Sequence, residues 1–529
     1  ADTQNNLAAA LAYQAEVSEG EPRARFLDES IKACRAALEV STQESHPLGW
    51  AALQNTLARS LVGQAAFGEG PERTARLAEA ARAFQSTLDV YKRDAYPKYW
   101  ALAHGNMGGA YFEGALLQAG AERDRLLNDA AEAYGLALQV YTREAYPTEW
   151  ASNRHNLGGV QYNQAKHSEG ERRTELLDQA VVSNRQALEV RTRESDPQSW
   201  AATQSNLASV LNTKAETAEV TERTQLLGEA IDALHAALEV YTREALPQDW
   251  AMAQLSLANN LQLQSNTVEG TERAKVLKEA VEAYSQVLEV YTREAMPRGW
   301  GIVQFNLAIT YYDLGLASTD TDRAQYFGAC AAAYGSAMEI YTREAAPEEW
   351  AMIQSNRANA FFQAGKLVQG AQRLQHFEEA VDAYKRALEV RTREAAPSSW
   401  ATTQSNLAAV LQEKLDASPA TEQPGLMDEI IAVYEGVQEV QTIAANPQAH
   451  AVAQQNLALV LLKRAAVQNG AARVETLQRA VAAMAASLEV WTEEAAPERY
   501  KPRKAWVEER EREIREAQAL LEGTPETSK

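Results

Sequence analysis

The sequence predicts an all-α protein, a solenoid built from about ten copies of a repeat that is fifty residues long. Three observations lead to this fold class. A proline recurs every fifty residues, a tryptophan follows most of these prolines, and each copy holds two stretches with apolar residues spaced three and four apart. The prolines are Pro47, Pro97, Pro147, Pro197, Pro247, Pro297, Pro347, Pro397, Pro447 and Pro497. A strict period of this length is typical of repeat arrays, in which each unit packs against its neighbours.

The proline opens the first of two predicted helices in each copy. Proline suits the first turn of a helix, because the N–H that it lacks has no partner there. The tryptophan column consists of Trp50, Trp100, Trp150, Trp200, Trp250, Trp300, Trp350 and Trp400, with His450 and Tyr500 in the last two copies. Beyond Trp200, Gln204, Leu207 and Leu211 continue one stripe at the helical period. We interpret tryptophan and glutamine as packing residues that keep successive copies in register, with each buried glutamine amide hydrogen-bonded.

A glycine is expected to end the first helix, in the left-handed conformation that glycine adopts at little cost. These glycines are Gly20, Gly70, Gly120, Gly170, Gly270, Gly370 and Gly470. The second helix is predicted to begin around Glu-Arg pairs such as Glu272 and Arg273, and Leu277 and Tyr284 lie on its apolar stripe. At its end we predict surface ion pairs four residues apart within each copy, such as Glu289 with Arg293, because that order is favourable on a helix.

The third copy resembles a known family of repeats. Its first helix contains Met107-Gly108-Gly109-Ala110-Tyr111, and Ala130, Tyr134, Ala137 and Pro147 follow. This pattern resembles the tetratricopeptide repeat, in which small residues let paired antiparallel helices pack closely. The resemblance extends over ten copies, although the period of 50 residues exceeds the family's 34. It implies a right-handed α-solenoid whose first helices line a concave groove.

The predicted organisation is a ten-copy solenoid over residues 1–498, a charged capping helix over 499–522 and a flexible tail over 523–529. A polar outer face is what a terminal repeat needs for solubility. Ala1 enters the repeat just after the position where tryptophan stands in the other copies. We therefore expect sequence upstream of it, with a fused upstream domain as one candidate.

Charge and cysteine usage narrow the function classes. The net charge is −21, from 51 Lys and Arg against 72 Asp and Glu. This balance argues against nucleic acid and membrane surfaces as partners, and makes a protein or peptide partner with a basic patch a reasonable complement. Two cysteines, Cys34 and Cys330, provide no disulfide framework. Without a signal peptide or a membrane-spanning apolar run, the expected location is cytoplasmic.

Asparagine recurs on the side of the first helix away from the core stripe, about 160° around the helix. This asparagine column consists of Asn6, Asn106, Asn156, Asn206, Asn306, Asn356, Asn406 and Asn456. Its Asn-Leu-Ala and Asn-Leu-Gly sequences resemble kinesin-light-chain-type repeats, where such asparagines hold the backbone of an extended peptide. An amide can both donate to and accept from a peptide group. We predict ligand contacts for Asn106, Asn156, Asn206, Asn306, Asn356 and Asn406; the alternative is that each asparagine bonds a neighbouring copy.

Variable positions beside the asparagine column are the candidates for specificity. One group departs from the repeat consensus in adjacent copies and consists of His104, Arg154, His155 and Tyr162. A more apolar group further along the chain consists of Leu255, Phe305, Ile309, Tyr312 and Phe362. Aromatic anchors of this kind often dominate binding energies. Drift at unconstrained positions is the alternative interpretation of both groups.

No pattern in the sequence predicts catalysis. The seven histidines have no metal-ligand spacing, and Gly105, Gly108 and Gly109 lie within a predicted helix without the lysine of a phosphate-binding loop. We predict no catalytic residue, metal or cofactor. The leading hypothesis is a non-catalytic interaction module that binds a peptide or protein segment in its concave groove. Its resemblance to long tetratricopeptide arrays implies the recognition arm of a larger bacterial signalling or effector protein. The alternative is a structural scaffold that self-associates or organises a multiprotein assembly.

Overall fold

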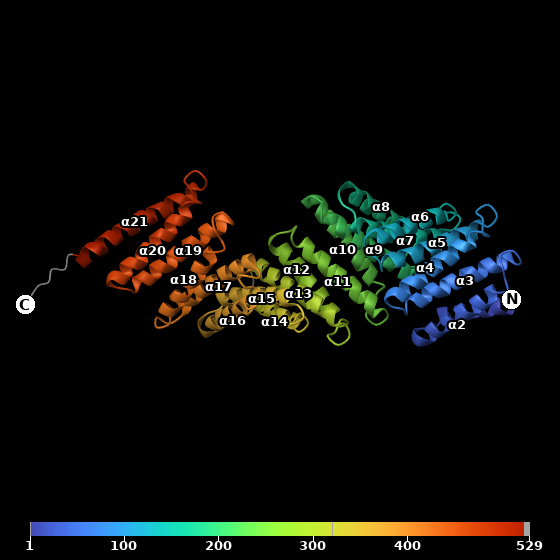
Figure 1. The fold of residues 1–529 in the computed structure, drawn as a ribbon, viewed down its shortest axis with the longest axis horizontal. Coiled ribbons are helices and arrows are strands. Elements are labelled where there is room, and N and C mark those ends of the chain that lie inside the picture. Colours follow the sequence, from blue (N-terminus) through green and yellow to red (C-terminus); the bar gives the residue numbers. More distant parts are fainter. Residues whose placement is uncertain (1, 320, 523–529) are drawn as a thin grey trace, which may run out of the picture. The chain divides into compact units, whose positions relative to one another are not determined.

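The computed structural model describes residues 2–319 and 321–522, and within them every regular element is an α-helix (Figure 1). The chain forms two compact units, residues 1–267 and 268–529. The predicted fold class, an all-α solenoid of about ten tetratricopeptide-like helix pairs, is confirmed. The predicted tail at 523–529 lies outside the described residues.

The N-terminal unit contains eleven helices among its described residues. They are α1 (Asp2–Glu16), α2 (Gly20–Leu38), α3 (Pro47–Ala65), α4 (Gly70–Thr87), α5 (Pro97–Ala115), α6 (Gly120–Ala137), α7 (Pro147–Lys166), α8 (Gly170–Leu188), α9 (Pro197–Ala215), α10 (Val220–Leu238) and α11 (Pro247–Gln264). Odd-numbered helices are the first helices of the copies, and even-numbered ones are the second helices.

The C-terminal unit continues the same alternation in its described part. Its helices are α12 (Gly270–Val287), α13 (Pro297–Ala317), α14 (Arg323–Ala337), α15 (Pro347–Leu367), α16 (Gly370–Leu388), α17 (Pro397–Ala417), α18 (Gln423–Gln438), α19 (Pro447–Ala466), α20 (Gly470–Leu488) and α21 (Pro497–Glu522). The last of these packs on α20 and contains the segment predicted to cap the array.

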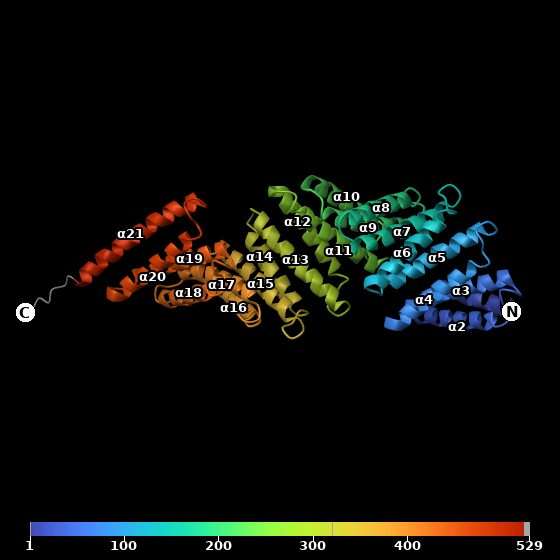
Figure 2. The same cartoon turned by 45° about the horizontal axis from the view of Figure 1, so that its top comes forward.

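Within each unit the helices stack in the order of the sequence, each against the helix before it and the helix after it (Figures 1 and 2). In the N-terminal unit the first helices of adjacent copies also touch one another, from α1 with α3 to α9 with α11. The first helices of this unit therefore lie on its inner side.

The turn between copies is built by a threonine to which the sequence analysis assigned no role. The Thr142 hydroxyl accepts a hydrogen bond from the backbone N–H of Ala145 (3.2 Å), and the Thr142 carbonyl accepts one from Tyr146 (2.9 Å). Pro147 then opens α7 as its first residue, as predicted for the proline column. Equivalent hydroxyl contacts recur at Thr242, Thr292, Thr342, Thr392, Thr442 and Thr492.

The seven predicted glycines do adopt the left-handed conformation, with φ between 53° and 61°. Their predicted place was wrong, because they begin the second helix instead of ending the first. The helix α3 ends at Ala65, and Gly70 is the first residue of α4. The positive φ thus turns the chain into the second helix. In the fifth copy Val220 takes this place, and the preceding Glu219 has φ −63° where Glu169 has −126°.

Small side chains let the helices approach closely in the core. The alanine after each tryptophan position has no exposed surface in Ala51, Ala101, Ala151, Ala201, Ala251, Ala351, Ala401 and Ala451. Trp150 is only 7% exposed and packs among Ala137, Tyr141 and Ala187. This packing agrees with the structural role that we predicted for the tryptophan column.

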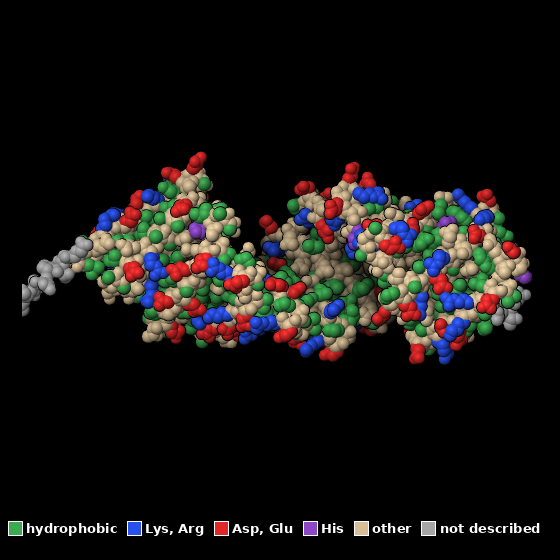
Figure 3. Space-filling view, viewed as in Figure 1, with side chains coloured by type: hydrophobic (Ala, Val, Ile, Leu, Met, Phe, Trp, Pro, Cys, Tyr) green, Lys and Arg blue, Asp and Glu red, His purple; other side chains and the backbone are tan. Residues whose placement is uncertain are grey.

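The predicted ion pairs within a copy are replaced by pairs between copies. Arg293 bonds Glu339 of the next copy at 2.5 Å, and Arg343 bonds Glu389 at the same distance. The same connection joins Arg143 to Glu189, Arg193 to Glu239 and Arg393 to Glu439. The predicted pairing within a copy is therefore wrong at Glu339 and Arg343, which bond Arg293 and Glu389 of the neighbouring copies. The arginine follows the end of the second helix and reaches forward to the next copy. Acidic and basic side chains accordingly intersperse on the face drawn in Figure 3.

Candidate ligand-binding grooves

A groove of about 360 Å³ lies on the first helices of the N-terminal unit. Its lining includes Asn106 and Asn156 of the asparagine column, and its floor includes Phe84 and Tyr134 from second helices. Glycines remove side chains from this surface. A Cβ atom on Gly105 would lie 2.9 Å from Oδ1 of Asn153, so a larger residue there would displace the Asn153 side chain between α5 and α7.

The charges of this N-terminal groove are mixed. Glu16 and Arg59 form an ion pair between α1 and α3 at its edge. Glu113 lies 3.8 Å from Arg73, and burial raises the pKa of Glu113 in spite of that arginine. A carboxylate that is partly removed from water is disfavoured in its charged form.

A second groove, of about 550 Å³, lies in the C-terminal unit between α17, α18, α19 and the start of α21. It too contains members of the asparagine column, Asn406 and Asn456. Arg499 is the one charged residue in its lining. This groove is called the C-terminal groove below.

In four copies the asparagine contacts a tyrosine of the preceding second helix. The side-chain amide of Asn156 makes a polar contact with the hydroxyl of Tyr134. The same contact joins Asn306 to Tyr284, Asn356 to Tyr334 and Asn456 to Tyr434. Burial raises the pKa of Tyr434 to about 12, and the contact with Asn456 opposes that rise. These contacts place the asparagine against a neighbouring copy, as in the alternative that we considered to ligand contact.

A signal for this contact was present in the sequence, at a spacing of twenty-two residues. All five copies with tyrosine in that column of the second helix are followed by an asparagine. Where cysteine or leucine replaces the tyrosine, at Cys34 and Leu234, the asparagine is replaced as well, by Thr56 and Ser256. Neither column alone reveals this pairing, because it appears only when the two columns are compared at that spacing.

The remaining asparagines have other surroundings. The Nδ2 atom of Asn206 lies 3.3 Å from Nε2 of His155, and Asn106 lies in the N-terminal groove. Tyr384 donates its hydroxyl hydrogen to Oδ1 of Asn359 in its own copy, while Asn406 lines the C-terminal groove. Every candidate of the column except Asn156 is half-buried, and Asn156 is exposed.

The polar candidates for specificity are held within the fold. His104 is 6% exposed and its ring meets Trp100 edge to face at 4.4 Å. Arg154 lies over the Trp150 ring, and the Tyr162 hydroxyl lies 3.3 Å from that of Thr213. None of these side chains lines the N-terminal groove.

His155 joins two copies in a buried polar cluster. Its Nδ1 atom lies 3.1 Å from the Thr203 hydroxyl, and Arg191 donates to that same hydroxyl at 2.9 Å. Burial and the nearby Arg191 lower the pKa of His155 to about 4. The imidazole is therefore neutral near pH 7, and its position links α7 to α9.

The apolar candidates pack from first helices onto aromatic rings of second helices. Phe305 meets Tyr334 at 5.8 Å between ring centres, Tyr312 meets Phe327 at 5.5 Å, and Phe362 meets Phe377 at 5.9 Å. All three are half-buried, as is Leu255 on α11. They form a layer continuous with the core and leave part of each ring accessible.

The glutamine column is buried, as predicted, in Gln254, Gln354 and Gln454. The predicted hydrogen bond is missing at part of it. Within the described chain, the Oε1 atoms of Gln254, Gln354 and Gln404 accept no hydrogen bond.

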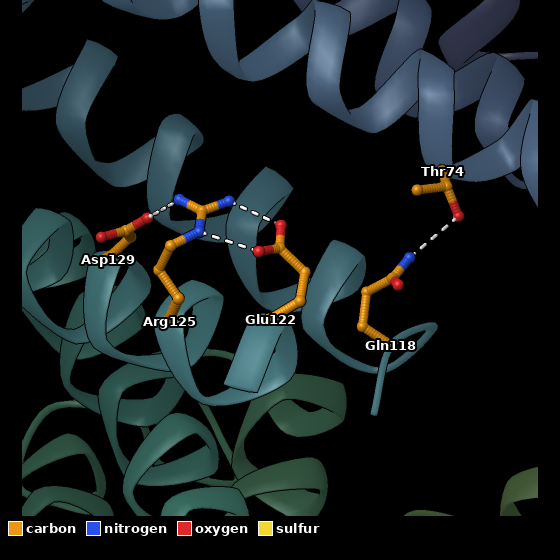
Figure 4. A network of polar contacts seen from close by, with 5 residues as sticks. All are labelled: Thr74, Gln118, Glu122, Arg125 and Asp129. Atoms are coloured by element: carbon orange, nitrogen blue, oxygen red, sulfur yellow. Dashed lines mark hydrogen bonds and ion pairs between the residues drawn. The ribbon is translucent and has the colours of Figure 1, made fainter. Parts of the chain in front are cut away.

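A smaller cavity between α4, α5 and α6 illustrates a site whose charges are satisfied internally. Arg125 donates to Glu122 at 2.6 and 3.0 Å and to Asp129 at 2.7 Å, while Gln118 donates to Thr74 of the preceding copy at 3.4 Å (Figure 4). Because the arginine is already shared by two carboxylates, this cavity offers a ligand less free polar capacity than the two grooves.

Among residues 2–319 and 321–522, no three His, Cys, Asp or Glu side chains come together as a metal site. No described helix is long and apolar enough to cross a membrane. Both cysteines are buried, and burial raises the pKa of Cys34 to about 11.

No family model and no curated protein matches this sequence. Solved structures that resemble it include yeast Tom70, at 13% identity over 99% of this chain and all of that chain, with a TM-score of 0.28. A signal transduction ATPase with a tetratricopeptide repeat sensor from Pyrococcus horikoshii matches at 10% identity over 94% of this chain and 74% of its own, with a TM-score of 0.34. The P58(IPK) TPR domain matches at 13% over 88% and 99%, with a TM-score of 0.23. Similarity at this level carries no information on what the present chain binds.

Proposed function

We propose that this chain is a non-catalytic protein-interaction module that holds an extended segment of a partner protein along its first helices. One observation carries the proposal. Asparagines of the same column line a groove in each unit, Asn106 and Asn156 in the first and Asn406 and Asn456 in the second. A residue type that helices mildly disfavour thus recurs where the surface is hollow.

The contact with tyrosine favours binding as well as packing. A side-chain amide has two donor hydrogens and two acceptor lone pairs, so the polar contact of Asn456 with Tyr434 leaves most of its capacity free. The same contact restricts the orientations of the amide. A group that is ordered before the ligand arrives loses less entropy on binding. The asparagine column can therefore hold a peptide backbone with whatever sequence the ligand has.

The wider role that we propose is the recognition arm of a larger signalling or effector assembly. Its support is the resemblance of the sequence to long tetratricopeptide arrays. The structural scaffold remains the competing function, and sedimentation velocity separates the two. A concentration-independent monomer is expected for a recognition arm, whereas concentration-dependent association would favour the scaffold.

The test of peptide binding uses a displayed library of random twelve-residue peptides selected against the whole chain. Peptides that survive selection are then measured by fluorescence anisotropy against Asn106→Ala with Asn156→Ala, and against Asn406→Ala with Asn456→Ala. We expect at least one pair of substitutions to weaken binding about tenfold, as the loss of two peptide hydrogen bonds predicts.

Asn469→Ala serves as the matched control, since this exposed asparagine precedes α20 and its side chain makes no capping bond. It should leave affinity unchanged. Circular dichroism verifies the fold of each variant. The proposal fails when no peptide is selected, or when both pairs of substitutions leave the affinity as it was.

A further inference from the structure

The C-terminal groove differs from its surroundings in charge. Most residues of its lining carry an amide or a hydroxyl group, and the lining consists of Thr402, Ser405, Asn406, Ala409, Tyr434, Gln441, Asn446, Gln448, Ala449, Val452, Ala453, Asn456 and Arg499. It contains a single cation and no carboxylate, although the chain as a whole carries a net charge of −21. Fields from distant charges are screened over about 8 Å at physiological salt, so the local cation decides which ligands are attracted into the groove.

Arg499 is held at the edge of this groove by an indole. It lies in the first turn of α21, and its guanidinium carbon is 5.2 Å from the ring centre of Trp491. Trp491 is 2% exposed and donates its Nε1 hydrogen to Oε1 of Gln448 at 3.0 Å. The indole is therefore a fixed platform, and a cation over an indole face is stabilised by the ring quadrupole.

A second arginine supports this corner from behind. Arg503 lies 4.4 Å from the same ring centre and donates through Nε to Oε1 of Gln455 at 2.8 Å. Its Nη1 atom donates to the backbone carbonyl of Arg499 at 2.8 Å. Burial and the neighbouring Arg499 lower the pKa of Arg503. The guanidinium groups of Arg499 and Arg503 thus lie over the same Trp491 ring, and the groups that accept hydrogen bonds from Arg503 are neutral.

Most other arginines of the solenoid are already paired with carboxylates, as Arg343 is with Glu389. In the described part of the chain Arg499 forms no ion pair. Its column, the residue before each tryptophan position, contains arginine in this copy alone. The cation is therefore specific to the C-terminal groove and is not part of the repeat consensus.

From this arrangement we infer that the C-terminal groove binds a peptide segment that carries a carboxylate, and that Arg499 pairs with that carboxylate. The inference rests on the proposed function, since the amides of Asn406 and Asn456 hold the backbone of the same segment. The carboxylate comes from an aspartate or glutamate side chain or from a chain terminus, which present the same chemistry to a guanidinium. The ligand thus differs from the partner with a basic patch that net charge alone suggests.

The N-terminal groove provides an internal contrast. It contains Glu16 and Glu113 together with Arg23 and Arg59, so a carboxylate entering it meets as many negative as positive side chains. We expect the preference for acidic peptides to belong to the C-terminal groove only. Substitutions in that groove should remove the preference, and substitutions at Asn106 and Asn156 should leave it in place.

The experiment measures the whole chain on an array of ten-residue synthetic peptides. Each aspartate- or glutamate-containing peptide is paired with its asparagine or glutamine counterpart, and each is made with a free and with an amidated C-terminus. The wild-type chain should bind the acidic member of responsive pairs about tenfold more strongly, since a bond between two charged groups is worth more than its neutral equivalent. The two kinds of pair show whether a side chain or a terminus supplies the carboxylate.

Arg499→Ala should reduce this preference to less than about twofold, and Arg499→Lys should retain part of it, because lysine keeps the charge but loses the planar fork. Arg515→Ala, a change at an exposed position further along α21, is the matched control and should change nothing. Circular dichroism and thermal unfolding confirm that the variants are folded.

The possible outcomes distinguish failure of this inference from failure of the proposed function on which it rests. A preference that survives Arg499→Ala overturns the inference. So does peptide binding that needs Asn406 and Asn456 but shows no acidic preference, although in that case the proposed function stands. A wild-type chain that binds no peptide of the array removes both.

Discussion

Replacing Tyr434 by phenylalanine tests whether a tyrosine orients the asparagine that we assign to peptide binding. The substitution removes one hydroxyl and leaves the ring, which is 2% exposed and packs in the core of the C-terminal unit. The hydroxyl contacts Asn456, which is half-buried in the C-terminal groove and can take up water instead. Loss of this polar contact should cost no more than about 1 kcal/mol of local stability.

The effect on affinity follows from the freedom that the amide regains. Ordering a polar side chain on binding costs about 0.5–1.5 kcal/mol. One amide that must now be ordered by the ligand should therefore weaken peptide binding about two- to tenfold. Hydrogen exchange of amides in α18 and α19 reports the local stability, because a repeat array does not unfold as a single two-state system. Fluorescence anisotropy with a selected peptide reports the affinity.

Tyr334→Phe provides the matched control. Tyr334 is 3% exposed and contacts Asn356 in the same way, but neither residue lines the C-terminal groove. It should show the same loss of stability around α14 and α15 without any change in affinity for a peptide in that groove. Equal affinities for the wild type and Tyr434→Phe would refute the idea that the tyrosine orients a binding group. Equal losses of affinity in both tyrosine variants would show that the effect is global.

Three further predictions concern stability. Gly365→Ala should destabilise α15 and α16 by about 1–3 kcal/mol in hydrogen exchange, since its Cβ would lie 2.7 Å from the Phe377 ring. Gly228→Ala, with nothing within 4 Å of its Cβ, should stabilise α10 by about 0.5–1 kcal/mol. Burial lowers the pKa of His155 from 6.5 to about 4 in the folded state, so its neutral form stabilises the fold above pH 6.5, and that stability is lost as pH falls from 6.5 to 4. Hydrogen exchange of amides in α7 and α9 between pH 7 and 4 should show an excess loss of about 2–3 kcal/mol that His155→Gln lacks. Arg343→Ala should change stability by less than about 1 kcal/mol, because its ion pair is half exposed, and a larger change would point to coupling along the solenoid.

The sequence predicted the fold through features that recur. Proline at the start of each first helix, alanine and tryptophan in the core and glycine with a positive φ all follow from backbone and packing rules that act within one copy. The contacts that it did not predict join different copies. Arg293 reaches Glu339 of the next copy, and Tyr134 reaches Asn156. Patterns within one helix cannot show such contacts, because the stagger between adjacent copies determines which columns meet.

The two grooves were predictable in part for the same reason. The placement of asparagine on the side of the first helix away from the core was deduced from the helical period, and the grooves do contain asparagines of that column. Which copies would be hollow was not deducible. That depends on local losses of side chain, such as Gly105 in the N-terminal groove.

The pairing of asparagine with tyrosine changes how the recurrence of asparagine is explained. If ligand contact alone maintained the column, its members would be independent of the preceding second helix. Instead, asparagine is present after every tyrosine of that column and absent after Cys34 and Leu234. Asn106 and Asn206, which follow Phe84 and Asn184, show that the tyrosine is not required. The tyrosine contact explains why an asparagine follows each tyrosine of that column. Only another contact of the side-chain amide explains why asparagine is also present in copies without the tyrosine. Of these two asparagines, Asn106 lies in the N-terminal groove, where a ligand would supply that contact.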